Sequence, residues 1–345
     1  MNSQLPNYTL LDADRTKEML KLFKGVRAGW VQVGEKKWFF PYTYTKEVEA
    51  FYNFKPRPSD TWIISYPRSG TTVMQELIWL LSNNLDFETV RKTKLTERFP
   101  FLERSLVNNP EVIEEFVTMD EGNVEKREVC ETLTRPAYEV LEGLSTPRFI
   151  QSHFPLSLRP SILDSGCKII YIARNPKDVV VSWYKMNKFT VTHGYIGDFS
   201  TFWNLFKNDL TIWSPYCEHV KEAWARRNHP NFLFIFYEEL SVDLLSVCKK
   251  VANFLGKNYS ENQLTELLNH LSIEKFRKNP MVNLNDLYEC GIFSSRQFFI
   301  GKGKTGHWKE FFSADMEKEA DEWIEQNLKD TDLVFPTTIM KGNCY

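Results

Sequence analysis

The sequence predicts an α/β fold in which a central, mostly parallel β-sheet is flanked by helices. Four short runs rich in β-branched and aromatic residues lack the polar alternation of a half-exposed strand, which indicates burial on both faces. Helical periodicity follows three of these runs and recurs near the end of the chain. With 345 residues, 42% hydrophobic and 26% charged, the chain has the composition of a globular protein and the length of one large α/β domain.

The predicted elements follow in order along the chain. Strands are predicted at residues 61–65, 148–151, 168–173 and 232–237. The first strand is followed by a helix, because apolar residues fall at i, i+3, i+4 and i+7: Met74, Leu77, Ile78 and Leu81. The third strand is followed by a helix that begins at Pro176, with Asp178 complementing its dipole. The same periodicity predicts helices over residues 244–255 and 316–324.

Charge and cysteine usage exclude several classes of protein. The formal net charge of −2 argues against nucleic acid binding through a basic surface. The six cysteines form no C-x-x-C pair, so we expect neither a zinc site nor a dense disulfide framework. The longest apolar runs are too short to span a bilayer, and the N-terminus lacks the pattern of a signal peptide. We therefore expect a cytoplasmic protein with no membrane span and no nucleic acid partner.

The turn after the first predicted strand has the features of an anion site. Residues 65–72 (SYPRSGTT) join this strand to a helix, and Gly70 allows a tight backbone path. The hydroxyls and N–H groups of residues 69–72 meet a helix N-terminus, and Arg68 adds a positive charge. The loop lacks the first glycine and the lysine of a Walker A sequence, which disfavours a P-loop kinase. The alternative interpretation is an ordinary capped helix start.

A second cationic position follows the third predicted strand. Arg174 comes directly after this strand, and Ser182 lies about two helical turns further on if Pro176 opens the helix. The two side chains could hold a second phosphate beside the first loop. Taken singly, each is more simply interpreted as a solvated side chain.

Four segments of the chain resemble sequence motifs of the cytosolic sulfotransferases. Residues 66–72 (YPRSGTT) and 172–183 (IARNPKDVVVSW) are similar to the two phosphosulfate-binding segments of that family. Residues 302–309 (KGKTGHWK) resemble its C-terminal signature, and residues 151–155 (QSHFP) resemble its catalytic histidine segment. The resemblance runs from about residue 54 to residue 333. Segments 217–226 and 328–333 are most similar to the insect members, a group that includes retinol dehydratase.

This resemblance implies a P-loop-like sulfotransferase fold and a set of ligand contacts. The co-substrate would be 3′-phosphoadenosine 5′-phosphosulfate (PAPS), the product PAP and the acceptor a small alcohol or phenol, with no metal. The 5′-phosphosulfate would be held by Arg68, Ser69, Gly70, Thr71 and Thr72. The 3′-phosphate would be held by Arg174 and Ser182, and the adenine by Tyr237. Further nucleotide contacts would come from Ser272, Ile273, Phe276, Phe299, Ile300, Lys302 and Gly303.

The same resemblance places the catalytic centre at residues 151–153. His153 would act as the general base that takes the proton of the acceptor hydroxyl, a role that suits a neutral imidazole, whose unperturbed pKa is roughly 6.5. Gln151 and Ser152 would contact the acceptor. We expect the five other histidines to be structural or surface residues: His193, His219, His229, His270 and His307.

Several positions depart from the family pattern. Arg68 and Gln151 stand where lysines are usual, Val73 replaces an aromatic residue that stacks on the adenine, and Gly301 replaces an arginine at the 3′-phosphate. Because Gln151 and Gly301 bring no charge, slower turnover or weaker PAPS binding is expected. The segment that forms the dimer in this family is also degenerate, since Lys309 is present but residues 313, 314 and 318 differ. The resemblance therefore indicates a homodimer only weakly.

The chain is interpreted as one domain, 1–345, in which residues 1–55 form an N-terminal segment of the substrate pocket. The aromatic stretches 38–44 and 51–54, together with Phe99 and Phe101, could line an apolar acceptor pocket. Core packing is the alternative role for these rings.

Three functions remain open from the sequence. The leading one is sulfonate transfer from PAPS to a small, largely apolar alcohol, phenol or steroid. The second is a dehydratase that sulfonates a retinoid-like alcohol and then eliminates the sulfate. The third is a non-catalytic protein that binds a nucleotide or a lipophile, which the missing charges at positions 151 and 301 suggest.

Overall fold

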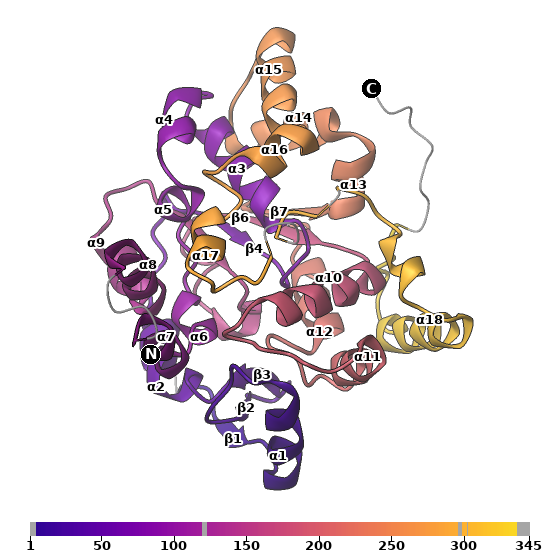
Figure 1. The fold of residues 1–345 in the computed structure, drawn as a ribbon. Coiled ribbons are helices and arrows are strands. Elements are labelled where there is room, and N and C mark those ends of the chain that lie inside the picture. The colour runs from indigo at the N-terminus through magenta and orange to yellow at the C-terminus, as the bar shows by residue number, and fades with distance from the viewer. Residues whose placement is uncertain (1–4, 119–122, 296–298, 302, 337–345) are drawn as a thin grey trace.

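A computed structural model describes residues 5–118, 123–295, 299–301 and 303–336. At its centre lies a four-stranded, fully parallel sheet with the strand order β5-β4-β6-β7 (Figure 1). The strands are β4 (Thr61–Ile64), β5 (Phe149–Ser152), β6 (Lys168–Ala173) and β7 (Phe232–Phe236). Each lies within one residue of its predicted range, so the predicted α/β class with a parallel sheet is confirmed.

Helices cover both faces of this sheet. Successive side chains of each strand point to opposite sides, so each strand supplies apolar side chains to the packing on both faces. Ile63, Ile170 and Ile235 pack against one layer of helices, formed by α3 (Thr71–Ser82), α14 (Leu244–Leu255) and α15 (Glu261–Leu271). Trp62 and Ile169 belong to the core on the other face, together with α10 (Pro176–Phe189), α11 (Phe199–Lys207) and α12 (Tyr216–Trp224). The continuous apolar strands of the sequence are therefore buried on both sides.

The predicted helices are all present. Helix α10 begins at Pro176, and the side chain of Asn175 accepts a hydrogen bond from the Lys177 N–H at 2.9 Å as the N-cap. Helix α14 ends at Gly256, which adopts the left-handed conformation typical of a helix C-terminus. The C-terminal periodicity corresponds to α18 (Ala314–Leu328).

A separate antiparallel sheet, which the sequence did not predict, lies at one end of the molecule (Figure 1, bottom). It consists of β1 (Tyr8–Leu10), β2 (Trp30–Val33) and β3 (Trp38–Pro41). In the chain, α1 (Ala13–Leu22) lies between β1 and β2, and α2 (Tyr44–Asn53) follows β3. The rings of Phe39 and Phe40 are fully buried in the main core, where Phe40 lies 5.4 Å from Phe154.

The pocket role expected for residues 1–55 stays a prediction, which the packing of the described residues 5–55 does not by itself support. No residue of 5–55 lines the large cavity described below, and the aromatic rings of 38–44 and 51–54 are mainly core residues. Through the packing of these rings, the small sheet is joined to the central sheet. Of the aromatic residues that were expected to line the acceptor pocket, only Phe101 lies at that cavity.

Shorter elements complete the described part of the chain. Between β4 and β5 these are α4 (Phe87–Lys92), α5 (Leu95–Arg98), α6 (Arg104–Val107), α7 (Pro110–Thr118), α8 (Val124–Thr134) and α9 (Ala137–Gly143). Further along the chain they are η1 (Leu156–Leu158), α13 (Tyr237–Val242), α16 (Ile273–Lys278), α17 (Asn285–Glu289) and η2 (His307–Glu310). Among the helices that the structure describes, none is long and apolar enough to cross a membrane.

Candidate active site

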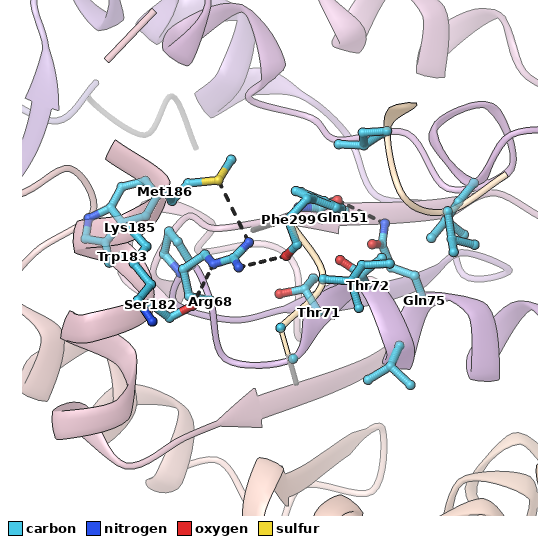
Figure 2. Close-up of a pocket in the computed structure, with 18 of the residues that line it drawn as sticks. Arg68, Thr71, Thr72, Gln75, Gln151, Ser182, Trp183, Lys185, Met186 and Phe299 are labelled. Atoms are coloured by element: carbon cyan, nitrogen blue, oxygen red, sulfur yellow. Dashed lines mark hydrogen bonds between the residues drawn. The ribbon is translucent and has the colours of Figure 1, made fainter. Parts of the chain in front are cut away.

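The carboxyl ends of the parallel strands meet at one large cavity of about 1120 Å³, which is where ligands bind in open α/β sheets. Figure 2 shows part of its lining. The cavity brings together most of the predicted site residues: Arg68, Gly70, Thr71, Thr72, Gln151, His153, Arg174, Ser182, Tyr237, Ser272, Ile273, Phe276, Phe299, Ile300 and Gly303. Lys302, also predicted, lies outside the described residues.

The loop between β4 and α3 has the strained, close-packed path that the anion site requires. Arg68 and Gly70 both have positive φ angles, of 70° and 102°. A Cβ atom added to Gly70 would lie 2.4 Å from the Tyr237 ring, so only glycine fits between this loop and the start of α13. The hydroxyls of Ser65 and Thr71 are 2.7 Å apart and tie the two ends of the loop together.

Arg68 spans the two halves of the predicted phosphate site. Its Nε donates to the Ser182 hydroxyl at 2.9 Å, and its Nη2 donates to the Phe299 carbonyl at 2.8 Å (Figure 2). The sequence interpretation assigned Arg68 and Ser182 to different phosphates, whereas the two side chains here are in direct contact. Burial, and then the neighbouring charge of Arg174, lower the pKa of Arg68 to about 10, which leaves it a cation at neutral pH.

Arg174 brings a second guanidinium to the same loop. Its Nη1 donates to the Arg68 carbonyl at 3.3 Å, and its Nη2 donates to the Lys304 carbonyl at 3.2 Å. The guanidinium lies over the Tyr237 ring, 4.2 Å from its centroid. Besides burial, the charge of Arg174 lowers the pKa of Arg68, so the two cations repel each other, and the Asp178 carboxylate lies 4.0 Å from Arg174 Nη2. A bound anion would relieve this repulsion, so the charge of the site suits phosphate groups.

Helix α10 also holds the C-terminal segment over this site. The carboxylate of Asp178, in its first turn, accepts hydrogen bonds from the backbone N–H groups of Gly306 at 2.8 Å and Trp308 at 3.3 Å. The predicted residues Phe299, Ile300 and Gly303 thereby line the same cavity as Arg174. This carboxylate helps to hold the segments 172–183 and 303–309 together, beside the hydrogen bond from Arg174 to the Lys304 carbonyl and the contact of the Lys177 ammonium with the Trp308 ring.

His153 is held in a single tautomer. Its Nδ1–H donates to the Ser65 carbonyl at 2.6 Å, so the lone pair of the neutral ring lies on Nε2. Burial lowers the pKa of His153 to about 3; the Ser65 hydrogen bond opposes this shift, and His219 and Arg68 add to it. The imidazole is therefore neutral at physiological pH, as a general base must be.

The Nε2 lone pair of His153 already has a partner in this structure. The Gln75 Nε2 donates to the Gln151 Oε1 at 2.9 Å (Figure 2) and to the Phe99 carbonyl at 3.2 Å. With its oxygen so engaged, Gln151 turns its amide N–H₂ toward His153 Nε2, 3.1 Å away. An acceptor hydroxyl must take the place of this amide to reach the base.

The backbone around His153 is fixed by a buried carboxylate that the sequence interpretation missed. Glu103 accepts hydrogen bonds from the backbone N–H of His153 at 3.2 Å, from that of Phe154 at 3.3 Å, and from the Ser152 hydroxyl. Burial raises the pKa of Glu103 to about 7, while its hydrogen bonds lower it. Glu103 reaches this place because residues 100–102 pair alongside β5, with the Gln151 N–H donating to the Pro100 carbonyl at 2.9 Å.

Two predicted side chains do not line the cavity. Ser152 was expected to contact the acceptor, but it is fully buried, because alternation along the strand turns it away from Gln151 and His153 toward Glu103. Ser69 is also fully buried, and its hydroxyl has no hydrogen-bond partner in the described part of the chain. Contact of Ser152 with the acceptor stays a prediction that this orientation does not support, and Ser69 can contribute to an anion site only through its backbone.

Three histidines that were expected to be structural or surface residues lie at the site, and one of them, His307, lines the large cavity. His219 donates from Nε2 to the His153 carbonyl at 2.9 Å and accepts at Nδ1 from the Tyr171 hydroxyl at 2.7 Å. His193 lines the large cavity. Nothing in the local sequence distinguishes them from other histidines. The only available signal for Glu103 was a charged residue directly after the apolar stretch 99–102.

Comparison with known proteins gives one family. The family model of the sulfotransferase domain matches residues 58–332. Luciferin sulfotransferase of Photinus pyralis is 33% identical over 319 residues, which are 88% of this chain and 81% of that protein. Sulfotransferase 4A1 of Homo sapiens is 31% identical over 290 residues, covering 84% of this chain and 87% of the relative.

The fold has the same neighbours. A crystal structure of retinol dehydratase in complex with androsterone and the inactive cofactor PAP superposes with a TM-score of 0.90 and 37% identity, covering 96% of this chain and 99% of that one. A structure of retinol dehydratase with retinol and PAP gives a TM-score of 0.89 at the same identity and coverage.

Proposed function

The chain belongs to the sulfotransferase family, and on that premise we propose that it transfers a sulfonate group from PAPS to the hydroxyl of a small, largely apolar acceptor. The observation that carries the proposal is the tautomer of His153 and the hydrogen bond that fixes it. Its Nδ1–H is bound to the Ser65 carbonyl, which leaves the Nε2 lone pair for a hydroxyl proton at the edge of a cavity that Arg68 and Arg174 also line.

The residues present fit the nucleotide. Arg68 and Arg174 supply fixed positive charge, and the glycine at position 70 lets the loop pass close to Tyr237. PAP is the ligand in both retinol dehydratase structures. We assign nucleotide binding to the predicted residues: Arg68, Ser69 (through its backbone), Gly70, Thr71, Thr72, Arg174, Ser182, Tyr237, Ser272, Ile273, Phe276, Phe299, Ile300, Lys302 and Gly303.

The chemistry requires a base and a stabilised leaving group. PAPS supplies a sulfur atom that forms a bond to the acceptor oxygen while its bond to the bridging phosphate oxygen breaks. His153 Nε2 takes the proton of the acceptor hydroxyl. Arg68, with the N–H groups at the start of α3, stabilises the negative charge that grows on the departing phosphate. Gln151, displaced from His153 by the acceptor hydroxyl, keeps N–H donors beside the reacting atoms.

A second candidate function is supported by the likeness to retinol dehydratase, at 37% identity over 96% of this chain. In this case the sulfonated alcohol would lose sulfate and release an alkene. A homodimer, a cytoplasmic location and the absence of a metal remain predictions of the sequence.

The test is incubation of the full chain with sulfur-labelled PAPS and a panel of phenols, steroids and retinoids, followed by mass spectrometry of the products. The expected result is a labelled sulfate ester of at least one acceptor. Release of labelled inorganic sulfate with an alkene product would favour the dehydratase. PAP binding with no acceptor consumed would overturn both and leave a binding protein.

A further inference from the structure

An aromatic wall with an imidazole at each end runs along the acceptor side of the cavity. The His153 ring lies 5.2 Å from Trp213, Trp213 lies 5.9 Å from Trp183, and Trp183 lies 5.4 Å from His193, centroid to centroid. All four residues line the large cavity, and each is at most 7% exposed. The wall thus joins the proposed catalytic base to a second buried histidine across two indoles.

The hydrogen bonds of His193 fix where its lone pair lies. Asn187 donates from Nδ2 to the Trp183 carbonyl at 2.8 Å, so its Oδ1 is free to accept from His193 Nδ1–H, 2.7 Å away. Burial lowers the pKa of His193 to about 4, and the ring is therefore neutral. Its lone pair lies on Nε2, which has no hydrogen-bond partner within the described ranges.

The hydroxyl groups of two threonines close to His193 in the chain also lack a hydrogen-bond partner in the described part of the structure. Thr190 and Thr192 line the same cavity and are each 4% exposed. Buried polar groups are as a rule paired, and an unpaired one at a cavity is open to a partner such as a water molecule or a ligand atom. The lining of this cavity thus offers the lone pair of His193, the two threonine hydroxyls and the indole N–H groups of Trp183 and Trp213, which also lack a partner among the described residues. An alcohol matches this set because it donates one hydrogen and accepts another.

We propose that the acceptor is a diol-like molecule whose second hydroxyl binds at His193, at the end of the wall opposite His153. The second hydroxyl donates its hydrogen to His193 Nε2 and accepts from Thr190 or Thr192. The body of the acceptor is a largely apolar ring system or polyene that packs along Trp213 and Trp183, whose rings are tilted by 56° to one another. The inference rests on the proposed sulfonate transfer and adds the substrate class to it.

The experiment compares two steroids that differ at one position. Androsterone has a hydroxyl at one end and a ketone at the other, and 5α-androstane-3α,17β-diol has a hydroxyl at both ends. A ketone cannot donate to His193 Nε2, so the wild-type kcat/KM for sulfonation of the 3α-hydroxyl should be about tenfold or more higher for the diol. 2-Naphthol, which has no second polar group, reports sulfonate transfer alone.

Variants of His193 separate the hydrogen bond from the packing. His193→Phe keeps a ring against Trp183 and should bring the ratio of kcat/KM for the diol to kcat/KM for androsterone down to about one. His193→Gln, which retains an acceptor oxygen, should restore part of this ratio. Equal kcat/KM for the two steroids in the wild type, or an unchanged preference in His193→Phe, would overturn the inference. No transfer to 2-naphthol or to either steroid would instead overturn the proposed function itself.

Discussion

At the scale of single residues, the site depends on hydrogen bonds that select one arrangement of a neutral imidazole. Ser65 fixes the proton of His153 on Nδ1, and Glu103 and His219 fix the backbone on either side of the ring. None of these partners is adjacent to His153 in the sequence. The imidazole is thus positioned by three separate segments that the sheet brings together.

His153→Ala should lower turnover by ~100- to 10,000-fold, because the acceptor proton loses its base. PAP affinity should change little, since no phosphate contact is assigned to this ring. Stopped-time assays with labelled PAPS and a titration of PAP by fluorescence give the two quantities. His229→Ala is the matched control, because His229 lies outside the residues that line the cavity. Near-wild-type turnover of His153→Ala would show that another group is the base.

Gln151→Lys should raise turnover with simple phenols, because a cation beside the reacting atoms stabilises the charge that develops on the departing phosphate. The position supports this, since the Gln151 amide lies 3.1 Å from His153 Nε2. Gln151→Met is the control: it also frees the imidazole from the amide but adds no charge. If turnover changes equally in both variants, the change comes from freeing His153 from the amide, and the expected contribution of the added charge is wrong.

At the scale of elements, two junctions between a strand and a helix build the anion site. The β4–α3 loop supplies Arg68 and Gly70, and the β6–α10 junction supplies Arg174. Their motifs were recognisable in the sequence because each lies within one short segment. The direct contact between Arg68 and Ser182 was not, because it joins residues that are 114 positions apart.

Arg174→Ala should weaken binding of PAP ten- to a hundredfold, which corresponds to the ~1.5–3 kcal/mol of a charge-assisted hydrogen bond. Adenosine 5′-monophosphate, which lacks the 3′-phosphate, should lose much less affinity. Calorimetric titration of both nucleotides into both proteins measures the difference. Arg174→Lys, which keeps the charge but not the two-donor fork, should fall between the wild type and Arg174→Ala. Equal weakening of the two nucleotides would mean that Arg174 only supports the loop through its contacts with the carbonyls of Arg68 and Lys304.

Gly70→Ala should both destabilise the protein and abolish nucleotide binding, because the added Cβ would meet the Tyr237 ring at 2.4 Å. Gly34→Ala separates the two causes. Gly34 also has a positive φ, of 67°, but no atom lies within 4 Å of an added Cβ. The control should therefore lose only the ~1–2 kcal/mol of the left-handed backbone and keep PAP affinity. Thermal unfolding with and without PAP measures both, and a Gly70→Ala protein that binds PAP like the wild type would contradict the close approach.

At the scale of the whole molecule, the sequence was informative where structure is local. The buried strands, the helices that follow them and the two anion-binding turns all carry their signal within about fifteen residues. The N-terminal sheet was missed because its aromatic strand, Trp38–Pro41, has no polar alternation and resembles a pocket lining as much as a core strand. Gln75, Glu103 and His219 were missed because their roles exist only after distant segments pack together.

The core also buries ionisable groups that link folding to pH. Burial lowers the pKa of His153 to about 3 and those of His193 and His219 to about 4. Below roughly pH 6.5 these three take up protons in the unfolded chain only, so falling pH removes stability. Glu103 and Asp209 act in the opposite direction, because burial raises the pKa of each to about 7 and the folded state takes up their protons first.

Taken together, these five groups should make the unfolded chain bind about one proton more than the folded protein near pH 5, which lowers the free energy of unfolding by ~1.4 kcal/mol for each pH unit of acidification. Asp209→Asn removes one of the carboxyls that oppose the histidines and should raise this dependence by about one proton. Asparagine has the same shape and tolerates the positive φ of 60° at this position, so the fold should be kept. Urea unfolding followed by tryptophan fluorescence between pH 4.5 and 7.5 gives the slopes. The same slope in both proteins would show that Asp209 is ionised in the folded state near pH 5, and the compensation between buried histidines and buried carboxyls would not hold.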